Sequence, residues 1–452
     1  MNTPICDFVK RYADTAPLRL HMPGHKGSAV LGPEPLDITE VEGADSLYEA
    51  SGIIAESERN ATALFGSAAT FYSTEGSSQC IRAMLFLAAA CAARSGNRAR
   101  VLALRNVHKT FVTAAGLLDV EVDWLMPSAG SSYLSCPVDT AVLESRLEQT
   151  RPVAFYLTSP DYLGNCADLV AIADVCHRHG VLLLVDNAHG AYLKFLSPSR
   201  HPLDAGADLC CDSAHKTLPA LTGAAYLHVG KHAPVWMKDA AKDALSTFGS
   251  TSPSYLILQS LDALNRTLAT DYADTLQAYT DRVARTRENL GRLGYSLVGD
   301  EPLKLTIAAG AYGYTGRELA GALCDRGIVC EFADTDFLTL MLTPQLGEDA
   351  LPTLEAALSE LQPRPSRSIT PPASYLPTRV RSIRKAMLAD RETLPVEDAL
   401  GRILATVNVA CPPAVPIAVC GERIDEEVIA RFVYYGITHC DVVREESIKK
   451  DG

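Results

Sequence analysis

The chain has 452 residues, of which 47% are hydrophobic and 21% charged, so we expect a globular, soluble protein of two or three domains. Its formal net charge of −13 at pH 7 argues against a nucleic-acid partner, which needs a basic face. The 13 cysteines include no C-x-x-C pair, which predicts reduced thiols in a cytoplasmic protein.

No secretory signal is visible at the start of the chain, and the longest apolar run, Ala83–Ala93, is too short to span a bilayer. We therefore expect no membrane partner.

From about residue 60 to 230, short apolar runs alternate with helix-like segments. This alternation is typical of an α/β fold with a largely parallel sheet covered on both faces. The predicted strands are Ala68–Tyr72, Val101–Leu104, Val122–Leu125, Val153–Leu157, Val181–Val185, Asp208–Cys211 and Ala224–Val229. Functional residues gather at the carboxyl ends of such strands. Polar residues that directly follow the runs should therefore share one edge: Thr74, Asn106, Thr158, Asp186 and Ser213.

The pattern changes after residue 262, where helices and strand pairs predict a small α+β domain, including a strand at Ile328–Phe332. A proline- and serine-rich linker and a last module follow, with predicted helices at Pro395–Ala405 and Asp425–Tyr434. The predicted divisions are an N-terminal arm (1–60), a large α/β domain (61–262), the small domain (263–362), the linker (363–377) and the C-terminal module (378–452).

Lys216 lies 30 residues after Asp186, an acid that ends an apolar strand, and it follows Ser213 and His215. This pattern predicts an enzyme that uses pyridoxal 5'-phosphate (PLP). The lysine would form a Schiff base, the acid would keep the pyridine nitrogen protonated, and the hydroxyl and imidazole would bind the phosphate. Three rival lysines lack this combination of flanking donors and preceding acid: Lys26, Lys109 and Lys194.

Other residues fit the same cofactor. Gly76, Ser77 and Ser78 lie between a strand and a helix, where backbone and hydroxyl groups can bind a phosphate. His108 follows another strand and offers a flat ring for stacking on the pyridine, and His189 lies near enough to Asp186 to orient it or to approach the cofactor.

No metal cofactor is predicted. Cys176, His177 and His179 are of metal-ligand types, but they fall at the end of an amphipathic helix before Gly180, where we expect no ligand role.

With these motifs the chain resembles the PLP-dependent ornithine/lysine/arginine decarboxylases, which have fold type I, the aspartate-aminotransferase fold. The resemblance covers nearly the whole chain and rests on ordered motifs. These are His21-Met22-Pro23-Gly24-His25-Lys26-Gly27, Asp37-Ile38-Thr39-Glu40, Gly76-Ser77-Ser78, Arg105-Asn106-Val107-His108-Lys109, Thr158-Ser159-Pro160, Asp186-Asn187-Ala188-His189, Ser213-Ala214-His215-Lys216 and Ser250-Thr251-Ser252-Pro253.

The resemblance implies a short-form enzyme with a large PLP-binding domain, a small α+β domain and a C-terminal α+β module. It also implies that His108 stacks on the cofactor, that Asp186 meets the ring nitrogen, and that the glycine loop, Ser213 and His215 bind the phosphate. It implies a homodimer in which Thr251 and Ser252 reach the partner's site.

The chain departs from the family at four positions near these motifs. Asn187 stands where a glutamate is common, Tyr192 where a histidine is common, Ala214 in place of a threonine and Gly223 in place of a glutamine. These departures leave the substrate open among arginine, lysine and ornithine.

We therefore expect a decarboxylase of a cationic amino acid, in which Lys216 or His215 returns a proton to the α-carbon. Two alternatives stay open: another PLP reaction, such as transamination or β-elimination, and a PLP-binding protein without catalysis. Acidic groups that meet the cationic side chain could include Glu422 and Asp425. The other interpretation of these two residues is that they begin a helix.

Overall fold

The computed structural model describes residues 1–127, 132–135, 137–367, 371–411 and 415–445. Residues 368–370 of the predicted linker, and 412–414 and 446–452 of the predicted C-terminal module, lie outside the described residues. The chain forms two compact units. Unit 1 comprises Met1–Ala88 and Leu182–Gln277, and unit 2 comprises Ala89–Val181 and Ala278–Gly452.

Seven strands form the large sheet, in the order β1-β7-β6-β5 within unit 1 and β4-β2-β3 within unit 2. The unit 1 strands are β1 (Ala69–Ser73), β5 (Leu182–Asp186), β6 (Leu209–Asp212) and β7 (Ala225–Val229). Strands β5 and β6 are parallel, and β7 is antiparallel to both β6 and β1. Consequently β1, β5 and β6 run in one direction and end at the same edge. Every residue of β5 and β7 is buried, as expected of strands covered on both faces. The predicted mixed α/β fold with a mostly parallel sheet is confirmed.

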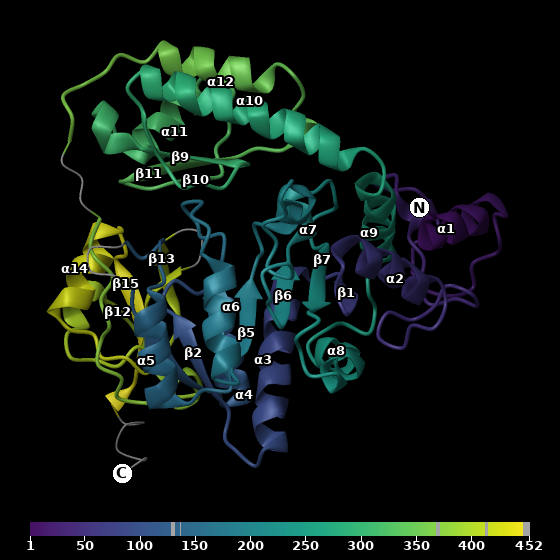
Figure 1. The fold of residues 1–452 in the computed structure, drawn as a ribbon, viewed down its shortest axis with the longest axis horizontal. Coiled ribbons are helices and arrows are strands. Elements are labelled where there is room, and N and C mark those ends of the chain that lie inside the picture. The colour runs from purple at the N-terminus through teal and green to yellow at the C-terminus, as the bar shows by residue number, and fades with distance from the viewer. Residues whose placement is uncertain (128–131, 136, 368–370, 412–414, 446–452) are drawn as a thin grey trace. The chain divides into compact units, whose positions relative to one another are not determined.

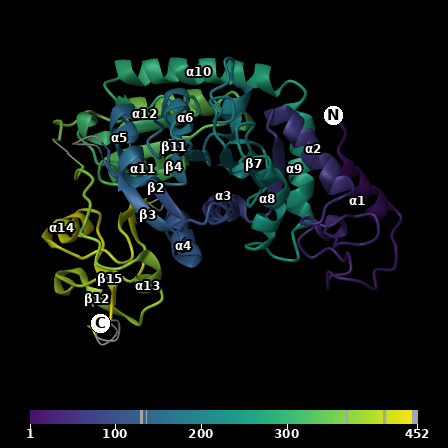
Figure 2. The same ribbon diagram turned by 60° about the horizontal axis from the view of Figure 1, so that its bottom comes forward.

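Three helices of unit 1 lie together: α1 (Pro4–Asp14), α2 (Ile53–Phe65) and α9 (Tyr255–Leu268) (Figures 1 and 2). The buried carboxylate of Asp262 on α9 accepts hydrogen bonds from the backbone N–H groups of Ile5 and Cys6, both at 2.9 Å, and from the hydroxyl of Ser57 on α2. Because the first N–H groups of a helix have no partner within it, Asp262 satisfies two donors at the start of α1. The other helical elements of unit 1 are η1 (Glu34–Leu36), η2 (Ala191–Phe195), α7 (Ala214–Thr217) and α8 (Trp236–Ser246).

The apolar run Ala83–Ala93 belongs to a longer helix, α3 (Gly76–Arg94), of 19 residues. By length and composition alone α3 could cross a membrane, and half of its most apolar stretch is buried inside the structure.

Unit 2 contains three parallel strands, β2 (Arg100–Leu104), β3 (Glu121–Leu125) and β4 (Ala154–Thr158). The helices that alternate with them are α4 (Lys109–Leu118), α5 (Thr140–Thr150) and α6 (Leu169–Arg178).

A separate antiparallel sheet in unit 2 has the order β10-β11-β9-β8. The long helix α10 (Tyr272–Arg292) precedes this sheet in the chain. The strands of the sheet and the helices between and after them are β8 (Ser296–Val298), β9 (Lys304–Ala308), η3 (Ala309–Tyr312), α11 (Gly316–Cys324), β10 (Phe332–Ala333), β11 (Phe337–Met341), η4 (Pro344–Leu346) and α12 (Ala350–Ser359). Helices α10 and α12 run side by side (Figures 1 and 2). The Glu355 carboxylate joins them by accepting from Thr286 and Asn289.

The predicted strand Ile328–Phe332 is wrong except at its last residue, because the ladder between β10 and β11 is only two residues long. The carboxylate of Asp334 accepts the N–H groups of Asp336 and Phe337 and so folds a tight turn directly after β10. Val329, inside the predicted strand, is 88% exposed.

The C-terminal part of unit 2 has two two-stranded sheets. Its elements are α13 (Ile383–Met387), β12 (Arg391–Pro395), η5 (Val396–Asp398), β13 (Asn408–Cys411), β14 (Val415–Ala418), α14 (Glu426–Tyr434) and β15 (His439–Val443). The predicted helix Pro395–Ala405 is wrong, since strand β12 ends at Pro395 and one turn of 3₁₀ helix follows. Gly401 has a φ of +80°, and Leu404 and Ala405 donate to the distant carbonyls of Glu422 and Asp441. The helix predicted at Asp425–Tyr434 is confirmed by α14.

Candidate active site

Three of the five polar residues predicted for one sheet edge, Thr74, Asp186 and Ser213, lie at the ends of strands in unit 1. Strands β1, β5 and β6 end at Ser73, Asp186 and Asp212, and all three point the same way. The start of α3 and the residue after β6 are in direct contact, because the Ser213 hydroxyl donates to the Ser77 hydroxyl at 2.8 Å.

Lys216 lies on the short α7, whose N-cap position is Ser213. Its half-buried amine has Nζ 3.1 Å from Nε2 of His189, which comes from the turn after β5. The three rival lysines are placed differently. Lys194 Nζ is paired with the Asp204 carboxylate at 2.7 Å, Lys26 Nζ donates to a backbone carbonyl, and Lys109 is exposed at the start of α4.

Two of the residues predicted to bind a phosphate, Gly76 and His215, lie close together. Nδ1 of His215 donates to the carbonyl of Ala224 at 2.9 Å. Burial lowers the pKa of His215, which favours its neutral form. Gly76 has a φ of +71°, and a Cβ built on it would lie 4.0 Å from Cε1 of His215. The positive φ therefore favours glycine at this position, while a Cβ there would make only ordinary contact with His215.

The departure at Gly223 has a steric reason. Its φ is +97°, and an added Cβ would lie 3.0 Å from the carbonyl oxygen of Thr74. The Gly223 carbonyl also accepts the N–H of Gly76 at 2.8 Å. The glycine thus lets its backbone approach residues 74–76, which lead into the helix start that carries Ser77 and Ser78.

Asp186, the last residue of β5, is only 2% exposed. One carboxylate oxygen accepts the N–H of Ala188 at 3.2 Å and lies 3.6 Å from the sulfur of Cys211. Burial raises the pKa of the Cys211 thiol well above its usual value, so this thiol stays protonated and can donate. A buried carboxylate of this kind is stabilised by a cationic partner such as a protonated pyridine.

Unit 2 carries other predicted residues. Asn106 follows β2, and Thr158 ends β4. Among the described residues, both polar atoms of the Asn106 side chain and the hydroxyl of Thr158 are buried without a hydrogen-bond partner, as polar groups near a ligand can be. His108 caps α4, with Nδ1 accepting the N–H of Thr110 at 3.2 Å. Its stacking on the cofactor stays a prediction.

The predicted contact with a second subunit also stays a prediction. Thr251 and Ser252 are exposed in the single chain, in a turn where the N–H of Ser252 donates to the Ser250 hydroxyl at 3.1 Å.

The donor set in unit 1 fits PLP. It combines a half-buried lysine amine beside an imidazole, a buried carboxylate, and two hydroxyls near the helix start at Gly76. These are the groups that an aldehyde, a pyridine nitrogen and a phosphate require.

Two acids of the C-terminal part have structural roles. Asp425 caps α14 by accepting the N–H of Val428 at 3.0 Å, which confirms the helix-start interpretation for this residue. Glu422 is 1% exposed and forms an ion pair with Arg105 at 3.0 Å. Sequence reasoning missed this pair, because the two residues lie far apart in the chain.

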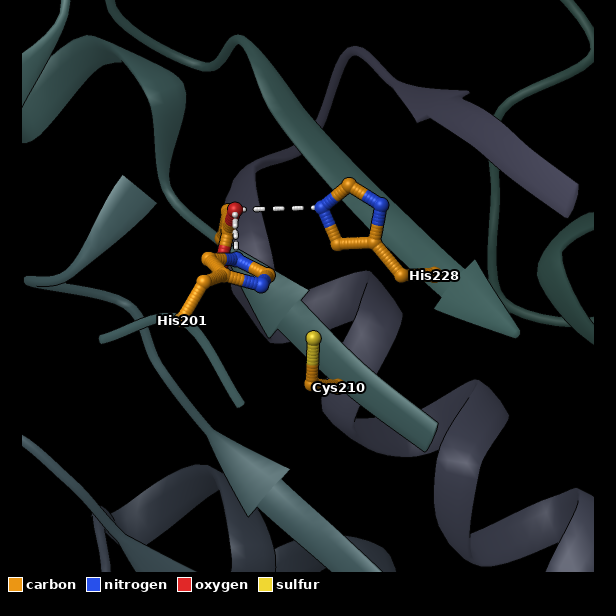
Figure 3. A group of neighbouring side chains, drawn as sticks. His201, Cys210 and His228 are labelled. Atoms are coloured by element: carbon orange, nitrogen blue, oxygen red, sulfur yellow. Dashed lines mark hydrogen bonds and ion pairs between the residues drawn. The ribbon is translucent and has the colours of Figure 1, made fainter. Parts of the chain in front are cut away.

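Sequence reasoning also missed a buried cluster behind the edge of unit 1. Among the described residues it is the one group whose donor atoms are of metal-binding types, and these atoms all lie within 4.8 Å of one another. Its members are His201, Cys210, Asp212 and His228 (Figure 3). The sequence feature that could have indicated this cluster is Asp212, the acid directly before Ser213.

Two family descriptions match the chain. Residues 3–296 match the major domain of Orn/Lys/Arg decarboxylase, and residues 368–438 match its C-terminal domain. An arginine decarboxylase of Halalkalibacterium halodurans is 30% identical over 463 residues, covering 95% of this chain and 92% of that protein. An arginine decarboxylase of Bacillus subtilis is 29% identical over 460 residues, with 95% and 92% coverage. The solved structure of the E. coli constitutive lysine decarboxylase has the same fold, with a TM-score of 0.78, 18% identity, and coverage of 98% of this chain and 82% of that one.

Proposed function

Since the chain belongs to the family of Orn/Lys/Arg decarboxylases, we propose that it is a PLP-dependent decarboxylase of a basic amino acid. The reaction would release carbon dioxide and leave a polyamine-type amine. One observation supports this most directly: Lys216 contacts His189, and both lie at the sheet edge where the buried Asp186 ends β5.

The residues of unit 1 divide the binding tasks. Lys216 would hold PLP covalently through Nζ, and Asp186 would keep a proton on the ring nitrogen. Ser77, Ser213 and His215 would bind the phosphate. When bound, PLP supplies an electron sink for the electrons released as the carboxyl group leaves.

The chain's own groups handle the proton. Nζ of Lys216 and Nε2 of His189 are 3.1 Å apart, so a proton can pass between them. After carbon dioxide leaves, a proton must return to the substrate carbon, and we assign this step to Lys216 or His215. Because Nδ1 of the neutral His215 ring donates its proton to the carbonyl of Ala224, Nε2 would have to take up a proton before that ring could donate one.

Carbon dioxide release from arginine, lysine and ornithine in the presence of PLP tests the function. We expect one of the three to be turned over and the Lys216→Ala variant to be inactive. The exposed Lys231 provides a matched control, and Lys231→Ala should retain activity. A keto acid in place of the amine would show transamination instead. Better turnover of neutral or acidic amino acids would contradict the cationic substrate.

Borohydride trapping tests the covalent lysine independently of turnover. The trapped adduct should map to Lys216 and be absent in Lys216→Ala. An adduct on Lys26, Lys109 or Lys194 would overturn the assignment.

The proposal includes a homodimer in the cytoplasm with active sites shared between subunits. It is supported by the exposed Thr251 and Ser252 and by the family resemblance. Mixing a Lys216→Ala chain with a Thr251→Ala/Ser252→Ala chain should restore activity if the sites are shared. Absence of recovery, with subunit exchange demonstrated, would contradict sharing.

A further inference from the structure

Behind the active-site edge of unit 1, a buried carboxylate joins three segments of the chain. Asp212 is fully buried, as are His201, Cys210 and His228. Cys210 on β6 lies opposite His228 on β7, and Asp212 is two residues further along β6, so these three side chains share one face of the sheet. His201 comes from the loop before β6 and points to the same carboxylate (Figure 3).

Hydrogen bonds account for the described contacts of the Asp212 carboxylate in this cluster, and no metal ion is needed to explain them. One oxygen of Asp212 accepts from Nε2 of His201 at 3.0 Å and from Nε2 of His228 at 3.1 Å (Figure 3). The N–H of Leu203 faces Nδ1 of His201 at 3.3 Å, so Nδ1 is an acceptor and the proton sits on Nε2. A metal ion on Nε2 would force that proton onto Nδ1, against the N–H of Leu203. We therefore interpret the cluster as a hydrogen-bond network.

The second oxygen of Asp212 accepts from the side-chain amide of Asn187 at 2.6 Å. Position 187 is one of the departures from the family, which commonly has a glutamate there. A carboxylate at that place would face the Asp212 carboxylate at hydrogen-bond distance, and two like charges so close cannot both stay ionised. Asn187 and Asp212 are thus matched, with an amide on one side and an acid on the other.

The network is connected to the catalytic groups through the backbone. Asn187 directly follows Asp186, its N–H donates to the carbonyl of Cys211 at 3.0 Å, and its carbonyl accepts the N–H of Gly190 at 2.8 Å. The turn so formed carries His189, whose ring contacts Lys216.

Asp212 is also followed directly by Ser213, the N-cap residue of α7, which carries Lys216. The Asp212 carboxylate therefore lies where two segments begin: the turn that carries His189 and the helix α7 that carries Lys216.

We propose that Asp212 and Asn187 are positioning residues. Their hydrogen bond sets the turn with Asp186 and His189 against the start of α7, and so fixes the surroundings of the Lys216 amine. The inference rests on the proposed function, because it assumes that Lys216 holds the cofactor.

A reciprocal exchange of the two side chains tests the pairing. Asn187→Asp places two carboxylates together and should lower the thermal unfolding midpoint. It should also shift the pH midpoint of the visible absorbance of the lysine-bound cofactor by about one unit or more. In the double variant Asn187→Asp/Asp212→Asn, the amide introduced at position 212 can donate to the carboxylate introduced at position 187, while the oxygen of that amide still accepts from both imidazoles. We expect both midpoints to return toward the wild-type values.

Asp208 provides a matched control. It is also a buried carboxylate that joins β5 and β6, since it accepts the N–H of Leu183 at 2.7 Å, but it does so at the other end of the strands. Asp208→Asn should lower the unfolding midpoint and leave the absorbance titration unchanged. If Asn187→Asp does not fold, Asn187→Ala removes the same bond without adding a charge, and it too should shift the titration.

The contrary outcomes are distinct. The positioning role would be overturned if the unfolding and absorbance midpoints did not recover in the double variant. It would also be overturned if the wild type and every folded variant at position 187 shared one midpoint in the absorbance titration. A stoichiometric metal ion in the purified protein, with a lower unfolding midpoint after chelation, would overturn the hydrogen-bond interpretation. A wild-type protein that forms no visible adduct with PLP would overturn the proposed function and this inference together.

Discussion

Replacing Glu422 with alanine should destabilise unit 2 strongly, because it leaves a buried guanidinium without its counter-charge. Arg105 and Glu422 are each 1% exposed and 3.0 Å apart. Arg105 also donates to the carbonyl of Ile417 and lies 4.8 Å from the ring centre of Trp124, contacts that do not neutralise it. Glu422 in turn accepts the N–H of Val419 at 2.7 Å, which would lose its partner. Breaking a buried ion pair from one side costs about 3–5 kcal/mol, and we expect a loss in that range.

Urea unfolding followed by tryptophan fluorescence measures this loss. The chain has two tryptophans, so a Trp236→Phe background makes Trp124, beside Arg105, the single reporter. The exposed pair Glu288–Arg292, with side chains 67% and 72% exposed, is the control. Arg292→Ala should cost less than about 1 kcal/mol.

The paired replacement Arg105→Leu/Glu422→Leu should recover most of the loss, since it leaves no uncompensated charge. A loss in Glu422→Ala no larger than that in Arg292→Ala would refute the reasoning.

Three further predictions concern single residues. Burial raises the pKa of Asp334 from 3.8 to about 6, so the folded state holds this proton to a higher pH than the unfolded state does. As the pH rises from about 4 through 6, the free energy of unfolding of the wild type should therefore fall by up to about 3 kcal/mol relative to that of Asp334→Asn. Urea unfolding at several pH values measures this difference. Parallel pH profiles of the two proteins would contradict the prediction. Gly223→Ala should cost about 1–3 kcal/mol and weaken PLP retention, measured by thermal unfolding and cofactor dialysis, because its φ of +97° and the Thr74 carbonyl leave little room for a side chain; wild-type values for both would contradict it. Asp425→Ala should cost about 1 kcal/mol through the lost cap of α14 while Asp425→Asn retains most of the stability, and equal losses in the two variants would count against capping.

The parts of the fold and site that could be predicted from the sequence depend on local patterns. Most strands of the large sheet are short apolar runs, Asp186 directly follows one of them and Ser213 comes two residues after another, so their shared edge could be predicted from strand direction alone. The α14 helix has an acid at its start and an apolar stripe, which again is local information.

The remaining features depend on contacts between distant segments. His201 and His228 reach Asp212 from a loop and from a neighbouring antiparallel strand, and no spacing rule connects the three. The Arg105–Glu422 pair joins residues 317 positions apart. The false helix at Pro395–Ala405 has apolar residues at helical spacing, but the positive φ of Gly401 and the hydrogen bonds of Leu404 and Ala405 to distant carbonyls override that pattern.

The interleaving of the two units affects how the chain folds during synthesis. Among the described residues, β7 is the one strand that pairs with β1. Roughly 150 residues separate the two, which a ribosome needs on the order of 8 to 30 s to add. During this interval the nascent β1 has no ladder partner, and an unpaired strand edge invites association with other chains. Unit 1 also cannot be expressed as one uninterrupted fragment, since its second half follows a segment of unit 2. We therefore expect the yield of this protein in a foreign host to depend on chaperones that bind the nascent chain until residue 229 has emerged.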